Sequence, residues 1–525
     1  MLRMPNSTTA SRSTGRNRKP SQKVLENSRL DAELQTSQVA PTTDSQAATT
    51  TKESQATTST EEPQAIKDEP LPIDEPLPEG HCKPIKTTSK GSLKRRSLPE
   101  VMADIPPIES VIFEPLNTGP DREPQLRLPS DININDPYAL FSLFWPENMW
   151  QIISRNTNLY AIKQRLGRVQ SEFMRPWFDT SAIEIKVFIA ILIYMGIHDS
   201  KRTDFYWRND ISSGPIHTPQ LYMSLNRFEQ IKRYLHISQP LGENTDEPQL
   251  EATTQYSDEY MKELWWRKVL PLADVFRNAC QQYYIPGTHT AIDELMIRCF
   301  GRSLHTYKMP NKPINQGYKL FALAEHGYIW WFIWSSRKHS FSTDIVIRPD
   351  LTPTGSMVYH LVKRLPVHSR VYLDNYFTSI PLFRLLRKEG YGLCGTTRPH
   401  SGGSEFPTLL KEIKQFHATS LPYHQIIAIT VPDVLCLGWQ DNNIVLALST
   451  IHTVHTAQDL VEKERRRPAK TSTNGSTTWK AFGDNSRMTM PIPRLIDDYN
   501  QHMGGVDIAN QFREPYETHR TTLRV

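Results

Sequence analysis

The order of elements between Asp293 and Asp374 constrains this 525-residue chain more than any other feature. Apolar alternation, unbroken apolar runs and a helical pattern ended by Pro366 follow one another there. We expect three strands, a helix and a fourth strand at 290–298, 318–324, 329–334, 356–365 and 371–373. Asp374 comes directly after the fourth strand, so its carboxylate should lie on the rim of an α/β sheet, where a ligand can reach it.

Two further helices are expected around this sheet. Thr378 or Ser379 can cap a helix that Gly390 ends, and its leucines would cover the sheet. Near the C-terminus, apolar residues from 496 to 506 recur at helical spacing despite Gly504 and Gly505, which each cost about 1 kcal/mol relative to alanine. Adjacent glycines let a helix approach a sheet or a metal site closely. Asp507 follows them at once.

Asp293, Asp374 and Asp507 therefore stand at three distinctive places. If the three carboxylates converge, their hard oxygens suit Mg²⁺ or Mn²⁺, and paired divalent ions are suited to cutting and joining phosphodiesters. Glu294 should point to the opposite face of its strand from Asp293, so we leave it out of the site. Taken singly, each aspartate also fits a surface ion pair, a turn or a helix cap.

A set of motifs, in order along residues 135 to 525, resembles the piggyBac family of transposases. The motifs are Asp204-Phe-Tyr-Trp207, Asp293-Glu294, Met309-Pro-Asn-Lys-Pro313, Asp374-Asn-Tyr-Phe-Thr-Ser, Gly395-Thr-Thr-Arg398 and Met503-Gly-Gly-Val-Asp507. The resemblance implies an RNase H-like (retroviral integrase-like) catalytic core. It also implies that Asp293, Asp374 and Asp507 are the catalytic DDD triad and the ligands of two Mg²⁺ or Mn²⁺ ions.

The same resemblance implies cut-and-paste DNA transposition. Water would first cut one strand at each element end, the freed 3′-hydroxyl would form a hairpin, and the reopened end would join a TTAA target. The implied partners are double-stranded DNA, as terminal inverted repeats and target, and a second copy of the chain in a homodimer. No nucleotide cofactor is expected. A chromosomal substrate favours the nucleus. Basic clusters such as Lys94-Arg-Arg96 and Arg465-Arg-Arg467 could serve as nuclear import signals, and exposed basic loops are the alternative interpretation.

Composition shifts divide the chain into parts. The 133 positions between Asp374 and Asp507, against 81 between Asp293 and Asp374, indicate an insertion. We expect a disordered low-complexity tail at 1–125, an α-helical domain at 131–285, the first part of the core at 286–398, a β-rich insertion at 399–490 and the last core helix at 491–525. For the helical domain, the resemblance implies DNA binding and dimerisation.

Basic residues near the first strand are candidates for contacts with DNA phosphates. They are Arg302, Lys308, Lys312 and Lys319, and a solvated hairpin is an equally good interpretation. The five cysteines are scattered without a CxxC pair, so no zinc site is expected. The longest apolar run, 187–197, is too short for a bilayer and is expected to be a buried helix that begins near Ser181.

Two departures from the family pattern keep a second function open. Asn510 stands where the family often carries a further aspartate, and the chain stops before the additional helix and cysteine-rich tail that family members commonly have. The alternative is a catalytically inactive, truncated or domesticated transposase-derived DNA-binding protein. A general metal-dependent nuclease is a third interpretation, but it leaves the motifs outside the site unexplained.

Overall fold

The computed structural model describes residues 96–166, 175–240, 266–301, 303–310, 312–337, 345–400, 405–416, 421–472 and 475–517. The chain divides into two compact units, Met1–Lys90 and Gly91–Val525. Residues 1–95, most of the tail predicted at 1–125, lie outside the described residues, and all described residues belong to the second unit.

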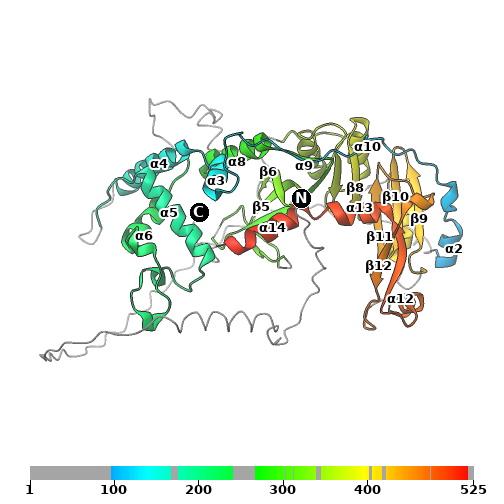
Figure 1. Ribbon diagram of the computed structural model, residues 1–525. Helices are drawn as coiled ribbons and strands as arrows, with labels where there is room; N and C mark the ends of the chain where they lie inside the picture. The colour runs from blue at the N-terminus through cyan, green and yellow to red at the C-terminus, as the bar shows by residue number, and fades with distance from the viewer. Residues whose placement is uncertain are drawn as a thin grey trace, which may run out of the picture. The chain divides into compact units, whose positions relative to one another are not determined.

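A mixed sheet of nine strands organises the unit (Figure 1). Five of its strands lie side by side in the order β6-β5-β3-β7-β8. Strand β5 is antiparallel to both β6 and β3, whereas β7 is parallel to both β3 and β8. This order is the one expected of an RNase H-like core. The strands are β3 (His289–Arg298), β4 (Tyr307–Lys308), β5 (Gln316–Glu325), β6 (Tyr328–Ser335), β7 (Arg370–Leu373) and β8 (Gly392–Thr396).

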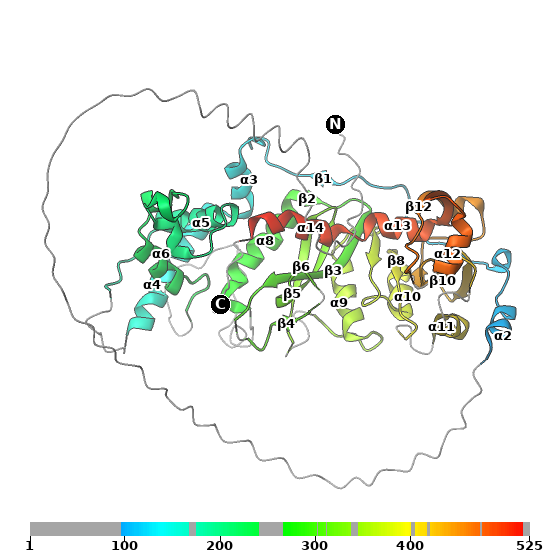
Figure 2. The same cartoon turned by 90° about the horizontal axis from the view of Figure 1, so that it is seen from below.

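Helices cover the two faces of these strands (Figure 2). On one face lie α9 (Pro353–Val362) and α10 (Ile380–Lys388), and on the other lie α13 (Arg494–His502) and α14 (Gly505–Arg513). The expected helices are thus present. The C-terminal one is divided at Gly504, and α9 begins earlier than predicted because the Thr352 side chain accepts a bond from the Gly355 amide and Pro353 fits the first turn.

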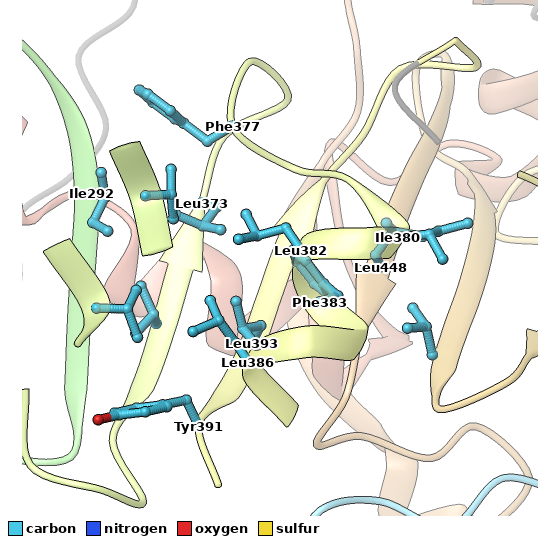
Figure 3. Close-up of a cluster of buried hydrophobic side chains, with 14 of the residues drawn as sticks. Ile292, Leu373, Phe377, Ile380, Leu382, Phe383, Leu386, Tyr391, Leu393 and Leu448 are labelled. Atoms are coloured by element: carbon cyan, nitrogen blue, oxygen red, sulfur yellow. The ribbon is translucent and has the colours of Figure 1, made fainter. Parts of the chain in front are cut away.

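The core beneath α9 and α10 is apolar and closely packed. Leu382, Phe383 and Leu386 from α10 meet Leu373 and Leu393 from β7 and β8 (Figure 3), and all five are fully buried. Burying a side chain of this size contributes roughly 1.5–3 kcal/mol. This packing holds the end of β7 in place, and with it Asp374.

The predicted insertion is β-rich, and its strands extend the same sheet. They are β9 (Ile426–Val431), β10 (Val434–Gln440) and β11 (Ile444–Ser449), and β11 pairs antiparallel with β8. A separate two-stranded sheet is formed by β12 (Leu460–Arg466) and β13 (Arg487–Pro493). Helix α11 (Thr408–Gln415) precedes β9, and α12 (Gly475–Phe482) connects β12 to β13. That β9, β10 and β11 continue the core sheet was not expected from the sequence.

Two arginines of the basic cluster at the end of β12 pack against aromatic side chains. Arg465 pairs with Asp441 and lies over the Trp439 ring, while Arg467 lies 3.8 Å from the centre of the Trp479 ring. Both arginines therefore stabilise the insertion, and the sequence pattern alone had suggested an exposed basic loop.

Residues 96–125 differ from the disordered tail predicted to reach 125. They include α2 (Leu98–Ala103), whose Val101 is fully buried in the main core. Farther along, the Leu116 amide donates to the Thr450 carbonyl, and Arg370 donates to Thr118. The segment therefore runs past the ends of β7 and β11, where the Thr450 carbonyl and the Arg370 side chain bind it.

The helical part holds α3 (Pro137–Phe144), α4 (Glu147–Arg165), α5 (Ala182–Ile197), α6 (Leu225–Tyr234) and α8 (Leu270–Tyr283). Its core joins residues of α4, α5, α6 and α8, and α8 also packs against β6. The predicted start of α5 is confirmed, since the Ser181 hydroxyl accepts from the Glu184 amide. Among the described residues, no helix combines the length and the apolar character needed to cross a membrane.

Candidate active site

Asp293 and Asp374 lie beside each other at one end of the core sheet. In the parallel pairing of β3 with β7, Ile292 is opposite Leu373, so the next residue on each strand path is an aspartate. The Asp293 carboxylate accepts from the Glu294 amide at 2.7 Å, and that of Asp374 accepts from the Tyr376 amide at 2.7 Å. Each carboxylate is thus oriented by backbone immediately after it.

The two carboxylates carry charge that the described residues do not neutralise with an ion pair. Burial raises the pKa of Asp293 to about 7, and the negative charges of Asp374 and Asp507 add to the effect. Burial also raises the pKa of Asp374, and Glu294 contributes in the same direction. A partly buried acidic pair of this kind is typical of functional sites, because a bound cation would remove the repulsion.

Asp507 approaches from the first turn of α14. Val506 is fully buried against Ala322 and Ala324 of β5, and Ala322 is the residue opposite Asp293. A Cβ on Gly505 would meet the Ala324 carbonyl oxygen at 3.2 Å, whereas a Cβ on Gly504 would meet nothing within 4 Å. The close approach predicted for the glycines is therefore made by Gly505.

The three aspartates share one face but do not form a closed metal cage. Asp507 is exposed, and among the described parts of the chain no three Asp, Glu, His or Cys side chains are grouped closely enough to hold a metal ion. The donor chemistry nevertheless fits Mg²⁺ or Mn²⁺, since Asp293 and Asp374 are adjacent hard oxygen donors with raised pKa values. Asp507 is a further oxygen ligand whose charge acts on Asp293.

Of the predicted phosphate-binding residues that the structure describes, Lys312 acts electrostatically on both carboxylates. Its charge lowers the pKa of both Asp293 and Asp374, against the larger effect of burial. Lys308 is exposed in the short strand β4. Arg302 lies outside the described residues.

Lys319 has a different environment from the surface position that the sequence suggested. Its ammonium group is buried and donates to Glu294 at 2.9 Å, and it faces the rings of Phe321 and Tyr376. Because its charge is already paired inside the protein, Lys319 is not available to a DNA phosphate in this structure. Glu294 lies beside Phe321 and not beside Ala322, so it is on the opposite face of β3 from Asp293, as predicted.

Asn510 takes part in a local contact of α14. Its side-chain oxygen accepts from Arg513 at 3.1 Å, and Arg513 also donates to the Met296 carbonyl at 2.6 Å. The amide thus helps hold the end of α14 on β3. An aspartate at this position would face the same arginine.

Tyr499 is a neighbour of the carboxylates that sequence reasoning did not single out. It lies on α13, and its hydroxyl is 3.3 Å from the Thr396 hydroxyl at the end of β8. Burial raises its pKa to about 12, and the negative charges of Asp374 and Asp293 contribute. Tyr499 therefore remains a neutral hydrogen-bond donor at physiological pH. The sequence signal for it was its place in the helical pattern at 496–506.

A buried Ser449, His452 and Asp498 chain fixes α13 to the sheet. The Ser449 hydroxyl is 2.7 Å from His452 Nδ1, and His452 Nε2 is 2.9 Å from Asp498. Ser449 is fully buried, so this arrangement has no access to a substrate and serves to hold α13. Asp498 precedes Tyr499 directly, so these hydrogen bonds also position the Tyr499 hydroxyl.

Comparison with known proteins decides the family. The family model described as Transposase IS4 matches residues 136–525, which include all three aspartates. The chain belongs to the piggyBac family of transposases. Among curated human proteins, it is 24% identical over 408 residues to "PiggyBac transposable element-derived protein 3" and 25% identical over 386 residues to "PiggyBac transposable element-derived protein 2".

These alignments cover 72% and 71% of this piggyBac-family chain, and 56% and 55% of the two relatives. The chain thus spans about half the length of the curated relatives it matches. A solved structure, "Cryo-EM structure of piggyBac transposase synaptic complex with hairpin DNA (SNHP)", is similar with a TM-score of 0.54 and 23% identity, covering 77% of this chain and 72% of that one. This likeness establishes a shared fold.

Proposed function

We propose that the protein is a piggyBac-like DNA transposase that cleaves DNA strands at element ends and transfers them to a TTAA target in a divalent-metal-dependent reaction. The observation that supports this most is the adjacency of Asp293 and Asp374 where the parallel pairing of β3 with β7 ends, with raised pKa values and no ion pair among the described residues. A family assignment alone would not require the carboxylates to be retained in this arrangement.

In this proposal, Asp293, Asp374 and Asp507 hold two Mg²⁺ or Mn²⁺ ions. When bound, the ions supply the positive charge that stabilises the attacking and departing oxygens of phosphodiester transfer. The chain's own contribution is to orient the carboxylates through the Glu294 and Tyr376 amides and to keep them ionised once their repulsion is relieved. Lys312, whose charge already acts on both aspartates, attracts the DNA phosphate to them.

The substrate is double-stranded DNA with terminal inverted repeats, and the target is a second duplex. Lys308, which is exposed, contacts further phosphates, and Arg302 stays a candidate from the sequence alone. Lys319 is left out because its charge is paired with Glu294. We further propose that the helical region 131–285 binds DNA and mediates a homodimer, and that the protein acts in the nucleus. The hairpin DNA named for the similar solved structure agrees with hairpin-ended DNA as an intermediate.

The direct test is cleavage of labelled DNA that carries the terminal repeats of the encoding element. We expect Mg²⁺-dependent nicking by the wild-type protein and at least a hundredfold loss in Asp374→Ala, since a metal ligand is removed. Asp433→Asn is a matched control, because Asp433 is an exposed aspartate at a positive-φ turn that asparagine also tolerates. Equal cleavage by wild type and Asp374→Ala would refute the proposal.

A second candidate function is DNA binding without cleavage. Two observations favour it. Asp507 is exposed, and the neutral Asn510 side chain is hydrogen-bonded to Arg513, so α14 supplies no buried carboxylate to the site. Absence of cleavage by folded wild-type protein that still binds the terminal repeats would support this candidate. Restoration of nicking by Asn510→Asp would return the assignment to an enzyme.

A further inference from the structure

The turn that follows Asp374 carries an exposed aromatic ring. Tyr376 is 44% exposed, while its neighbour Phe377 is 2% exposed. Only Asn375 separates Tyr376 from Asp374, so the Cα atoms of Asp374 and Tyr376 are within about 8 Å of each other. The ring therefore stands next to the site where strand cleavage is proposed.

The backbone that presents this ring is fixed by hydrogen bonds. The Tyr376 amide donates to the Asp374 carboxylate at 2.7 Å, the Thr378 hydroxyl donates to the Asp374 carbonyl at 2.8 Å, and the Phe377 amide donates to the same carbonyl at 3.2 Å. An exposed side chain on such a turn loses little backbone freedom when it takes up a ligand.

The ring itself is supported from behind. Phe321 lies nearly parallel to it, with an interplanar angle of 11° and a centroid distance of 6.4 Å, and Phe377 meets it edge-on at 5.1 Å. The Lys319 ammonium is 5.3 Å from the centre of the Tyr376 ring and is itself held by Glu294. Tyr376 is thus the outermost member of a packed aromatic stack.

A cationic side chain adjoins the same turn. Arg398 is exposed, and its Nε donates to the Asn375 side-chain oxygen at 2.7 Å. Its charge also reaches Asp374, whose pKa it lowers against the larger effect of burial. The guanidinium group has further N–H donors besides Nε, and these suit a phosphate oxygen.

We propose that Tyr376 and Arg398 form a binding site for one unpaired nucleotide beside the cleaved phosphate, with the base stacked on Tyr376 and the adjoining phosphate bound by Arg398. The proposal rests on the proposed function. Bases inside a duplex have both faces covered by their neighbours, so only an unpaired base presents a free face to a protein ring. Base stacking on aromatic side chains tolerates any base, so the site would recognise an open or hairpin end by its conformation.

The test uses a DNA stem closed by a TTAA loop, with 2-aminopurine in place of one loop adenine, and the Asp374→Asn protein to prevent turnover. We expect binding to quench 2-aminopurine fluorescence at least twofold. In the Tyr376→Ala background the quenching should disappear and the affinity should fall roughly tenfold, within the range of stacking on one ring. Tyr376→Phe and Tyr376→Trp should both retain quenching.

Two controls separate the possible failures. Tyr516→Ala removes a similarly exposed ring, 65% accessible, and should leave quenching and affinity unchanged. A probe with 2-aminopurine in the stem should respond equally to wild-type and Tyr376→Ala proteins. If the hairpin is bound but Tyr376→Ala quenches and binds as wild type does, the nucleotide site is refuted while the proposed function stands. If no variant binds the hairpin, the proposed function itself fails.

Discussion

The two faces of β3 treat neighbouring carboxylates in opposite ways. Glu294 faces Phe321 and Lys319, where its charge is paired with a buried ammonium at 2.9 Å. Asp293 faces α14, where burial and two further carboxylates raise its pKa to about 7. One strand thus carries a neutralised charge that stabilises the fold and an uncompensated one that costs stability.

At Asp293 the protein keeps a charge that lowers its stability. A charge shielded from water without a partner is destabilising, and such charges cluster at functional sites, where a ligand can supply the missing charge. The Glu294 and Lys319 pair has no such need, and it supports the aromatic stack under Tyr376 instead. The predictions below test this contrast.

The largest effect is expected for Glu294→Ala. Removing this carboxylate leaves the Lys319 ammonium buried without its partner, which should lower the free energy of unfolding by about 3–5 kcal/mol. Chemical denaturation measures the change. Glu147→Ala is the matched control, because Glu147 pairs with Lys186 at the surface with 68% of its side chain exposed, and its loss should cost less than about 1 kcal/mol. Equal costs for the two variants would remove the contrast between buried and exposed pairs.

Asp293→Asn should raise the free energy of unfolding, whereas Glu294→Ala lowers it. Because the native pKa of about 7 lies above the unfolded value near 3.8, native Asp293 binds a proton that the unfolded chain releases, and stability falls as pH rises from about 4 to about 7. In the presence of a chelator, we expect the variant to be more stable than wild type by on the order of 2 kcal/mol at pH 8, allowing for solvent screening at the sheet edge. The asparagine oxygen can still accept from the Glu294 amide.

The pH dependence provides the check on that variant. At pH 4 wild-type Asp293 is protonated in the native state, so the advantage of Asp293→Asn should shrink toward zero. Denaturation at pH 4 and pH 8 gives the two differences. A variant that is less stable than wild type at pH 8 would show that Asp293 is already neutralised within the protein.

The smallest effect concerns the helix that brings Asp507 to the same face. Gly505→Ala would place a methyl group 3.2 Å from the Ala324 carbonyl oxygen, whereas Gly504→Ala would meet open space at an ordinary negative φ. We expect Gly505→Ala to be less stable than Gly504→Ala by about 1–2 kcal/mol in thermal or chemical unfolding. Identical stabilities would mean that α14 does not depend on close contact with β5.

Local patterns predicted much of the core, because periodicity and stop signals act within one element. The three strands, the helices α9 and α10 and the placement of Asp374 after β7 follow from such signals. The predicted cap of α10 is wrong, because Ser379 makes no side-chain capping hydrogen bond and the Thr378 hydroxyl donates to the Asp374 carbonyl. The adjacency of Asp293 and Asp374 needed the additional knowledge of a family fold, since nothing local fixes the pairing of β3 with β7.

Long-range partners were not predictable in the same way. Lys319 looked exposed because the register that puts it near Glu294 is set by the whole sheet. Arg465 and Arg467 looked like a basic loop because their partners, Asp441 and Trp479, belong to other elements. The low-complexity composition likewise concealed the fact that Val101 enters the main core.

The central claim is that Asp293 and Asp374 form a site for divalent ions. The most direct measurement is Mn²⁺ binding at pH 8 by isothermal titration calorimetry, with the unfolding temperature followed in parallel. We predict that Mn²⁺ binds and stabilises the wild-type protein, that Asp293→Asn and Asp374→Asn each weaken binding at least tenfold, and that Asp433→Asn binds as wild type does. Unchanged Mn²⁺ binding in the folded Asp293→Asn/Asp374→Asn double variant would contradict the account.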